Sequence, residues 1–216
     1  MKQVVVCVAT DLEAAGLPSH DRVGNLKLAV VKTGVGPVNA ALGLARHLAL
    51  RPAPAGDVEA VDLVVSLGVG GAYPDSGLAI GDVVCAKSEY YGDLGAQSPE
   101  GFLDMEALGF AVVGEYYNRL PLGFFPTATR CPFVTRSTCT GTEAEAREIV
   151  ERTGGAVESM EGAAIVHTAI AHALPVAEIR GISNTVGNRD RSKWRLDEAA
   201  RAAGSELAQW LEVQSC

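Results

Sequence analysis

The chain has 216 residues, of which 48% are hydrophobic and 20% are charged, and its formal net charge is −8. This length suits one domain over residues 1–216 with a sizeable core, and the acidic balance argues against a nucleic-acid or anionic-membrane surface, because such surfaces need clustered Lys and Arg. The apolar stretches are too interrupted to span a membrane, and the five cysteines follow neither a disulfide nor a zinc spacing, so we expect a cytoplasmic protein with reduced thiols.

The first half of the chain alternates strand-like and helix-like patterns. Apolar, β-branched runs typical of strands covered on both faces are residues 4–9, 26–31 and 63–67. Residues 33–37 predict a tight turn, and Pro37 suits the first position of a helix over residues 38–50. Residues 51–56 are typical of a surface linker, and residues 81–91 predict a longer strand with one exposed face.

The second half begins with an irregular stretch. Residues 92–132 are aromatic and rich in Pro and Gly, which predicts a substrate lid or a subunit contact, with ordinary loop packing as an equal alternative. Residues 133–139 predict a strand, and Thr142 and Glu145 match a capping box whose helix should end at Gly154. Residues 196–211 predict an amphipathic helix. Strands that alternate with helices indicate an α/β domain with a mainly parallel sheet.

Residues 157–190 carry the most informative pattern. Glu161 comes directly before a helix so rich in Ala, Ile and Val that most of its circumference should be buried. A buried carboxylate needs a partner, and the small neighbours Gly162 and Ala163 leave room for a ligand. A strand-forming run then ends at Asn184. Because ligands collect at the carboxyl ends of strands in open α/β sheets, we expect Glu161 and Asn184 to face one pocket.

Other polar residues admit two interpretations each. Glu13 follows the first strand, where a carboxylate lies at the edge of the sheet or improves a helix N-terminus, and spacing alone favours the second. Asn184 by itself is also a common turn residue. His167 and His172 are five residues apart, which is unsuitable for a helical metal pair, so we expect no metal site.

Several enzyme classes are disfavoured by missing motifs. Residues 68–74 depart from a dinucleotide-binding fingerprint, because Tyr73 stands where the fingerprint needs a glycine. The sequence also lacks the serine-hydrolase elbow and the phosphate-binding loop. The remaining carboxylates, amide and glycine turns suit a reaction that needs an activated water, anchored hydroxyl groups and a leaving group held by hydrogen bonds.

These motifs resemble the nucleoside phosphorylase and nucleosidase superfamily. The resemblance rests on five segments in order, residues 9–13, 33–37, 68–71, 158–164 and 180–184. It covers nearly the whole chain and is closest to the futalosine hydrolases of menaquinone biosynthesis, with methylthioadenosine/adenosylhomocysteine nucleosidases and purine nucleoside phosphorylases as alternatives. It implies a three-layer α/β/α sandwich with a mixed, mainly parallel sheet, no cofactor, and a homodimer or higher homo-oligomer whose sites often borrow residues from a neighbouring subunit.

The resemblance also implies roles for single residues. Glu13 takes the position of the carboxylate that orients and deprotonates the attacking water. Met160 packs against the ribose, Glu161 accepts hydrogen bonds from its hydroxyl groups, and Val69 and Gly70 lie beside the substrate. The chemistry fits this arrangement, because cleavage of an N-glycosidic bond builds positive charge on the sugar, which nearby carboxylates stabilise.

Departures from the family pattern predict the substrate. Asn184 stands where adenine-releasing relatives have Asp, and an amide suits a 6-oxopurine, so we expect hypoxanthine to be released from futalosine. Phosphorolytic relatives hold phosphate with Arg and Ser where this chain has Ser66 and Val69, so water is the expected nucleophile. Arg189 and Arg136 are candidates to meet the benzoate of futalosine, with a solvated surface arginine as the alternative for each. A catalytically silent nucleoside-binding protein is a further alternative.

Overall fold

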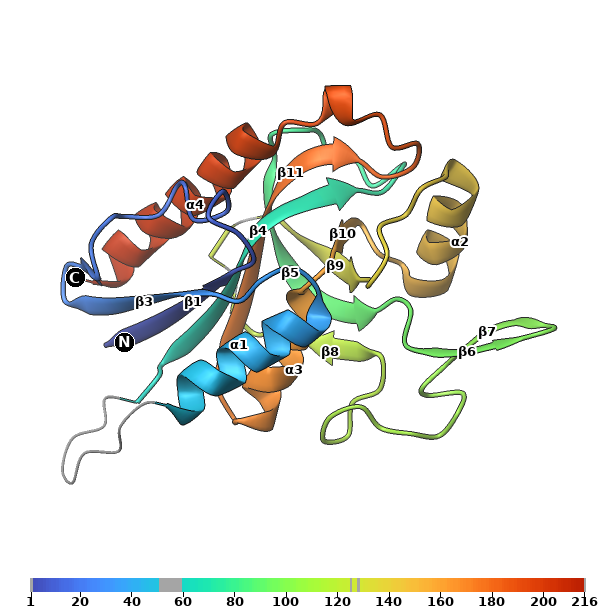
Figure 1. The fold of residues 1–216 in the computed structure, drawn as a ribbon, viewed down its shortest axis with the longest axis horizontal. Helices are drawn as coiled ribbons and strands as arrows, with labels where there is room; N and C mark the ends of the chain where they lie inside the picture. Colours follow the sequence, from blue (N-terminus) through green and yellow to red (C-terminus); the bar gives the residue numbers. More distant parts are fainter. Residues whose placement is uncertain (1, 51–59, 125, 128, 216) are drawn as a thin grey trace.

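The computed structural model describes residues 2–50, 60–124, 126–127 and 129–215, and its centre is a mixed β-sheet (Figure 1). The strands of this sheet are β1 (Gln3–Val8), β2 (Arg22–Val23), β3 (Leu26–Lys32), β4 (Leu63–Ala72), β5 (Val83–Tyr91), β8 (Arg119–Pro121), β9 (Arg130–Thr135), β10 (Val157–Ser159) and β11 (Val176–Thr185). A separate hairpin consists of β6 (Gly95–Ser98) and β7 (Gly101–Asp104). The helices are α1 (Pro37–Ala49), α2 (Glu143–Thr153), α3 (Gly162–Ala171) and α4 (Leu196–Gln214), with a short 3₁₀ helix η1 (Arg191–Lys193).

The strand order is β10-β9-β5-β11-β4-β1-β3-β2, and β8 pairs with β5. Strand β4 is parallel to both β1 and β11, and β9 is parallel to both β5 and β10, whereas β11 and β5 are antiparallel. The predicted mixed, mainly parallel sheet is confirmed. The sheet is not fully open, because β10 also pairs with β4. This pairing closes the strands from β4 to β10 into a ring.

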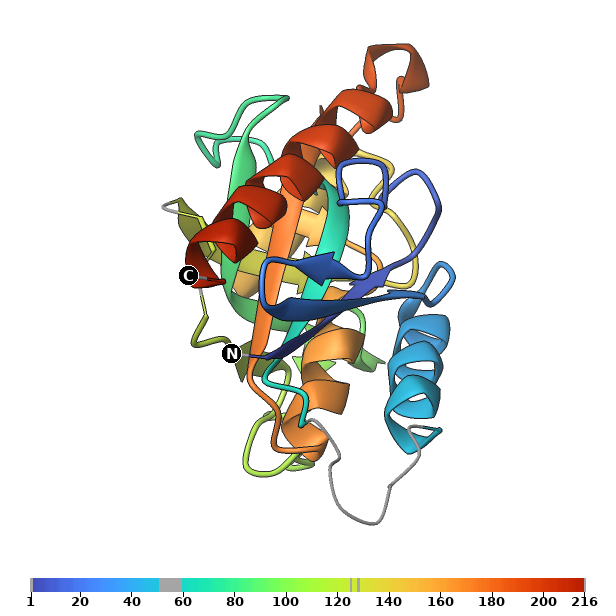
Figure 2. The same ribbon diagram turned by 90° about the vertical axis from the view of Figure 1, so that its left-hand side faces the viewer.

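Helices cover both faces of the sheet, as the predicted three-layer sandwich requires. Helices α1 and α3 pack on one face, and the long helix α4 crosses the other (Figure 2). Strand β1 shows why the chain needs both layers, because all six of its residues are buried. Val5 enters the core beneath α1 and α3, while its neighbours Val4 and Val6 enter the core beneath α4, as the alternation of side chains along a strand demands.

Two predicted strand boundaries were wrong. Strand β4 continues to Ala72, so the glycines of residues 68–71 lie inside a strand and do not form a turn. They allow close crossings, since a Cβ on Gly70 would lie 2.6 Å from Val157 of β10. Strand β9 runs from Arg130 to Thr135 and not over residues 133–139, because the chain leaves the sheet after Thr135 and turns toward the polar groups described below.

The signals at the helix ends were read correctly. Pro37 opens α1, and the Thr142 hydroxyl caps α2 by accepting a hydrogen bond from the backbone N–H of Glu145 at 3.2 Å. Gly154 ends α2 with a left-handed φ of 67°. Residues 51–56, the predicted linker, lie outside the described residues. None of the helices in the described ranges combines the length and the apolar character that crossing a membrane requires.

Candidate active site

A cavity of about 390 Å³ opens where β1, β4 and β11 end and α3 begins. Seven residues singled out in the sequence line it: Glu13, Val69, Gly70, Met160, Glu161, Asn184 and Arg189. Glu13 lies more than 100 residues before Glu161 and Asn184, and the parallel pairing of β1, β4 and β11 brings Glu13 and Asn184 to the same edge of the sheet. The expectation that Glu161 and Asn184 face one pocket is confirmed.

Glu13 is buried at the end of β1 and held by backbone donors. Its Oε2 accepts hydrogen bonds from the N–H groups of Ala9 at 2.8 Å and Thr10 at 3.2 Å, and its Oε1 accepts one from Val69 at 3.1 Å. The helix-capping alternative is wrong, because residues 11–16 form turns and no helix begins there. The three donors hold the carboxylate in a single orientation at the wall of the cavity.

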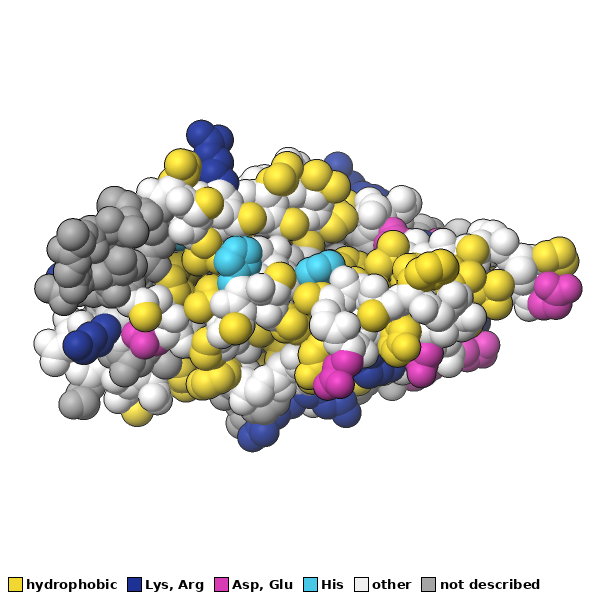
Figure 3. All heavy atoms as spheres, turned by 90° about the horizontal axis from the view of Figure 1, so that it is seen from below, with side chains coloured by type: hydrophobic (Ala, Val, Ile, Leu, Met, Phe, Trp, Pro, Cys, Tyr) yellow, Lys and Arg dark blue, Asp and Glu magenta, His cyan; other side chains and the backbone are white. Residues whose placement is uncertain are grey.

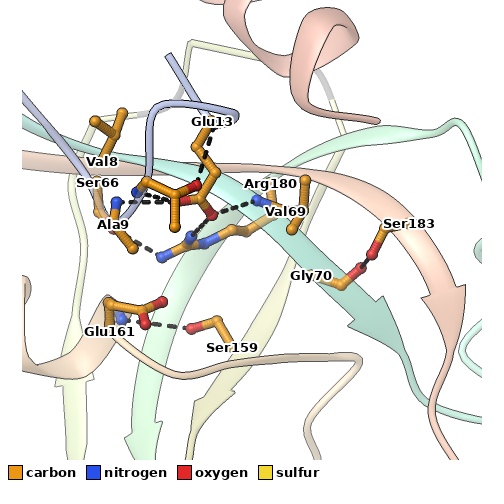
Figure 4. A network of polar contacts seen from close by, with 12 residues as sticks. Val8, Ala9, Glu13, Ser66, Val69, Gly70, Ser159, Glu161, Arg180 and Ser183 are labelled. Carbon is orange, nitrogen blue, oxygen red and sulfur yellow. Dashed lines mark hydrogen bonds and ion pairs between the residues drawn. The ribbon is translucent and has the colours of Figure 1, made fainter. Parts of the chain in front are cut away.

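Arg180 on β11 is a component that the sequence analysis missed. It is 1% exposed, its Nε donates to Glu178 Oε1 at 2.8 Å, and its Nη2 donates to Ser66 Oγ at 2.9 Å. Its Nη1 lies 3.8 Å from Glu13 Oε1, and Figure 4 shows these two side chains pointing toward one another. The sequence did contain a signal for this residue. Glu178 and Arg180 stand inside an apolar strand pattern, and buried charges need partners.

The pKa of Arg180 reflects these partners. Burial by itself lowers the pKa of a guanidinium, but the carboxylates of Glu178, Glu13 and Glu161 outweigh burial and raise the pKa of Arg180 above its usual value. Arg180 is therefore a permanent positive charge beneath the cavity.

Gly68 on β4 lets the acid and the guanidinium lie directly against the backbone of this strand. A Cβ at this position would lie 2.2 Å from Glu13 Oε1 and 2.2 Å from Arg180 Nη1, so no larger residue fits without moving one of them. The two groups are a hydrogen-bond acceptor and a donor 3.8 Å apart, so one water beside them can hydrogen-bond to both.

Glu161 and Met160 lie on the opposite side of the cavity, at the start of α3. Glu161 Oε1 accepts a hydrogen bond from the N–H of Gly36 at 2.8 Å, and its side chain does not cap α3. Burial is the largest effect on Glu161 and raises its pKa, while Arg180 opposes that rise. Met160 is half-buried and contacts Cys139, with 3.4 Å between the two sulfur atoms.

Asn184 follows an irregularity in the pairing of β11 with β4, between Ile182 and Asn184. Its Oδ1 accepts a hydrogen bond from the Ser183 hydroxyl at 2.8 Å, and its Nδ2 donates to the carbonyl of Thr185 at 3.1 Å. These contacts fix which end of the amide is the donor. The second N–H of Nδ2 remains for a ligand.

The two candidate arginines have different surroundings. Arg189 lines the cavity, and its guanidinium lies 5.4 Å from the ring centre of Trp194, which also lines it. Arg136 is not a lining residue, and its guanidinium is engaged by the Thr140 hydroxyl at 2.7 Å and by Glu145 at 2.9 Å. The structure therefore brings Arg189 and not Arg136 to the cavity.

The sequence analysis also missed Glu158, a further buried acid of this cavity. Its Oε2 accepts hydrogen bonds from the Tyr73 hydroxyl at 2.7 Å and from the Thr140 hydroxyl, and its Oε1 accepts one from the Thr140 N–H at 2.9 Å. Glu158 and Thr140 line the cavity, so this network forms one of its walls. Within the described ranges, no group of three or more His, Cys, Asp and Glu residues has a geometry suited to a metal ion.

Comparisons with known proteins show the family of this chain. The model of the phosphorylase superfamily matches residues 19–212. The futalosine hydrolase of Streptomyces coelicolor is 40% identical over 210 residues, covering 94% of this chain and 87% of that protein. The futalosine hydrolase of Thermus thermophilus is 35% identical over 182 residues, covering 80% and 76%.

Solved structures show the same fold. The MTA/SAH nucleosidase of Streptococcus pneumoniae in complex with 8-aminoadenine has a TM-score of 0.79 and 22% identity, covering 98% of this chain and 99% of that one. The corresponding nucleosidase from Neisseria meningitidis, in complex with methylthio-immucillin-A, has a TM-score of 0.79 and 20% identity over 99% of this chain and 100% of that one.

Proposed function

The chain belongs to the phosphorylase superfamily and, within it, to the futalosine hydrolases, and from this membership we propose its reaction. The protein hydrolyses the N-glycosidic bond of futalosine and releases hypoxanthine and dehypoxanthine futalosine, a step of menaquinone biosynthesis. The observation that carries the proposal is the meeting of Glu13, Glu161 and Asn184 in one cavity. A base, a sugar anchor and a purine anchor are the groups that this cleavage needs.

In the proposed mechanism, Glu13 is the general base. An attacking water lies on the cavity side of Glu13, beside the pair formed by Glu13 Oε1 and Arg180 Nη1, which are 3.8 Å apart. Arg180 orients the water, while Glu13 accepts its proton as the oxygen attacks the anomeric carbon. The backbone donors on Glu13 hold its carboxylate in place, and such positioning accounts for a large part of the rate of a general-base reaction.

Glu161 and Met160 hold the sugar in this proposal. The carboxylate of Glu161 accepts hydrogen bonds from the ribose hydroxyls, and Met160 packs against the ring. As the bond to the base breaks, positive charge develops on the sugar between Glu13 and Glu161. Two acids in a buried site stabilise that charge more strongly than water does, because the surroundings screen them less.

Asn184 and the end of β4 bind the purine. The purine leaves with the electron pair of the broken C–N bond and takes a proton from solvent, while the free N–H of the Asn184 amide donates a hydrogen bond to it. Val69 and Gly70 form the adjacent wall. Hydrogen bonds from Ser183 and to Thr185 keep the amide in this orientation. An amide held as a donor matches the acceptor atoms of hypoxanthine, which supports hypoxanthine as the leaving base.

Electrostatics favours water over phosphate as the nucleophile. Phosphate needs uncompensated positive charge, but the Arg180 guanidinium already faces the carboxylates of Glu178, Glu13 and Glu161. Ser66, at one position where phosphorolytic relatives bind phosphate, contacts Arg180, whose Nη2 donates to its hydroxyl at 2.9 Å, and it does not line the cavity. A second anion in this place would be repelled.

The outer end of the cavity suits the benzoate of the substrate. Arg189 supplies a cation and Trp194 supplies an aromatic face at this end. A planar aromatic carboxylate pairs with a guanidinium and packs on an indole ring at the same time. We assign the benzoate to Arg189 and not to Arg136, whose guanidinium is occupied.

We also propose that the protein works as a homodimer or higher homo-oligomer in the cytoplasm. Helix α1 exposes Val38 at 70% and Leu42 at 63%, and Val35, which lines the cavity, is 50% exposed just before this helix. Figure 3 shows the underside of the molecule, where hydrophobic and histidine side chains occupy the middle and charged groups lie toward the margins. An apolar surface continuous with the cavity supports a neighbouring subunit that completes it.

An assay of base release tests the proposal. Purified protein is incubated with futalosine or with methylthioadenosine, with and without phosphate, and the products are separated by chromatography. We expect hypoxanthine from futalosine without phosphate. Faster adenine release would identify a methylthioadenosine/adenosylhomocysteine nucleosidase, phosphate-dependent turnover would identify a phosphorylase, and binding without turnover would identify a silent nucleoside-binding protein.

A further inference from the structure

Two further buried acids meet behind Arg180. Glu89 on β5 and Glu178 on the adjacent, antiparallel strand β11 are both 0% exposed. Their carboxyl groups converge on the start of α3, because a Cβ on Gly162 would lie 2.1 Å from Glu89 Oε1 and 2.3 and 2.4 Å from the two oxygens of Glu178. Neither acid lines the cavity, so the proposed reaction does not use them directly.

The hydrogen bonds of this pair are incomplete. Glu89 Oε2 accepts from the Thr135 hydroxyl at 2.9 Å, and Glu178 Oε1 accepts from Arg180 Nε at 2.8 Å. Glu89 Oε1 and Glu178 Oε2 have no hydrogen-bond partner among the described residues. Two ionised carboxylates have no donor to offer one another, whereas one proton between them gives both oxygens a partner. Buried polar atoms in native proteins are nearly always paired, so the proton is the simplest completion.

The surrounding charges also favour a proton. Among the described residues, the titratable and charged groups that act on the pair from the neighbouring elements are Arg180, Glu161, Tyr91 and Cys85, and Glu13 lies beyond Arg180. Only one of them is a cation, and it already faces two carboxylates of the cavity. Burial, followed by the charge of Glu178, raises the pKa of Glu89 well above its usual range. A second negative charge here would lack a counter-charge.

We propose that Glu89 and Glu178 share one proton and, as a singly charged pair, position Arg180 for the nucleophile. Glu178 holds Nε and Ser66 holds Nη2, which leaves Nη1 facing Glu13 Oε1 at 3.8 Å. The shared proton changes how strongly Arg180 acts on the attacking water. A doubly charged pair would draw the positive charge of Arg180 away from Glu13, whereas a singly charged pair leaves part of that charge for the attacking water.

The shared proton is tested first without any substrate. Infrared difference spectra at neutral pH between the wild type and Glu89→Gln should contain the carbonyl stretch of a protonated carboxyl group, present only in the wild type. Glu148→Gln, on an exposed position of α2, is the matched control and should leave that band in place. Absence of the band from the wild type overturns the proposal.

The pH dependence of unfolding gives a second measurement. A raised folded-state pKa stabilises the protein below the usual value of 4.5, and this stabilisation is lost as pH rises toward the folded-state value. Within that window the folded state holds one proton more than the unfolded state. The unfolding equilibrium constant therefore increases about tenfold for each unit by which the pH rises. Glu89→Gln should remove this dependence and Glu148→Gln should keep it. An unchanged dependence in Glu89→Gln overturns the proposal.

The positioning role rests on the proposed function and needs kinetics. Glu178→Gln should lower kcat for futalosine about tenfold with KM within about twofold, because a neutral amide oxygen holds the guanidinium less strongly than a carboxylate. The double variant Glu89→Gln/Glu178→Gln should lower kcat further. Full kcat in Glu178→Gln overturns the positioning role. A wild type that carries the infrared band but does not cleave futalosine would refute the proposed function and leave the proton pair standing.

Discussion

The cavity has two ends that are built in different ways. Its floor is Glu13, backed by Ser66, Gly68 and Arg180, which lie behind the cavity wall and do not line it. All four are buried on strands or at a strand end, and short contacts join them. Its rim consists of Arg189, Trp194 and Leu196, which lie after β11 and are exposed or half-buried.

The two ends have different tasks: the floor carries out the chemistry and the rim selects the substrate. The floor is held by neighbouring strands and cannot adjust without disturbing the sheet, whereas the rim belongs to a connecting segment. We therefore expect floor variants to change kcat and rim variants to change KM. The following variants test that division, in order of decreasing expected effect.

Glu13→Gln removes the base from the floor and should have the largest effect. We expect turnover of futalosine to fall on the order of 10³-fold, because general-base catalysis typically contributes between 10² and 10⁴, with nucleoside affinity retained in calorimetry. Asp11→Asn is the matched control, since Asp11 lies two residues earlier, is exposed and pairs with Lys32. Residual activity above about a tenth of the wild type would remove the assigned role of Glu13.

Gly68→Ala places a methyl group against Glu13 Oε1 and Arg180 Nη1, so at least one of these side chains must move. We expect kcat to fall on the order of 10²-fold, since small displacements of reacting groups have effects of this size. Gly123→Ala is the control, because Gly123 is exposed and nothing lies within 4 Å of the added Cβ. Steady-state kinetics on variants with matched thermal unfolding would decide the question, and normal kcat in Gly68→Ala would show that turnover does not need Glu13 and Arg180 in these positions.

Asn184→Asp tests the base-binding side, where the floor meets the rim. A carboxylate replaces the amide donor and repels the acceptor atoms of a 6-oxopurine, so kcat/KM for futalosine should fall about tenfold or more. The same measurement on a 6-amino analogue should show a smaller loss. Equal kinetics for wild type and variant on both substrates would contradict the purine-binding role of Asn184.

Arg189→Ala tests the rim and should have the smallest effect. We expect KM for futalosine to rise about three- to fivefold with little change in kcat, since exposed ion pairs contribute about 1 kcal/mol or less. A 6-oxopurine nucleoside without a carboxylate should show no such change. Arg191→Ala is the control, because Arg191 also lies over Trp194, at 5.8 Å, but does not line the cavity. Equal KM changes in both variants would argue against a benzoate contact.

Local patterns in the sequence predicted much of the fold. The β-branched runs of β1 and β3, the proline that opens α1 and the cap at Thr142 each act within a few residues, so the chain itself shows them. The carboxylate of Glu161 was identified for a similar reason, since a charge beside an apolar helix is conspicuous. The predicted end of β4 was wrong, because residues 68–71 belong to the strand through their pairing with β10 and β11.

Local patterns in the sequence did not predict the charged floor. Arg180 meets Ser66 across 114 positions of sequence, and Glu178 meets Glu89 only because β11 and β5 are neighbours. The sequence by itself determined which residues form strands and helices and which acids need a partner, because propensity and the cost of burying charge act on the residues themselves. The tertiary structure decided which acids share one cation and one proton, because strand order and register alone set the distances between them.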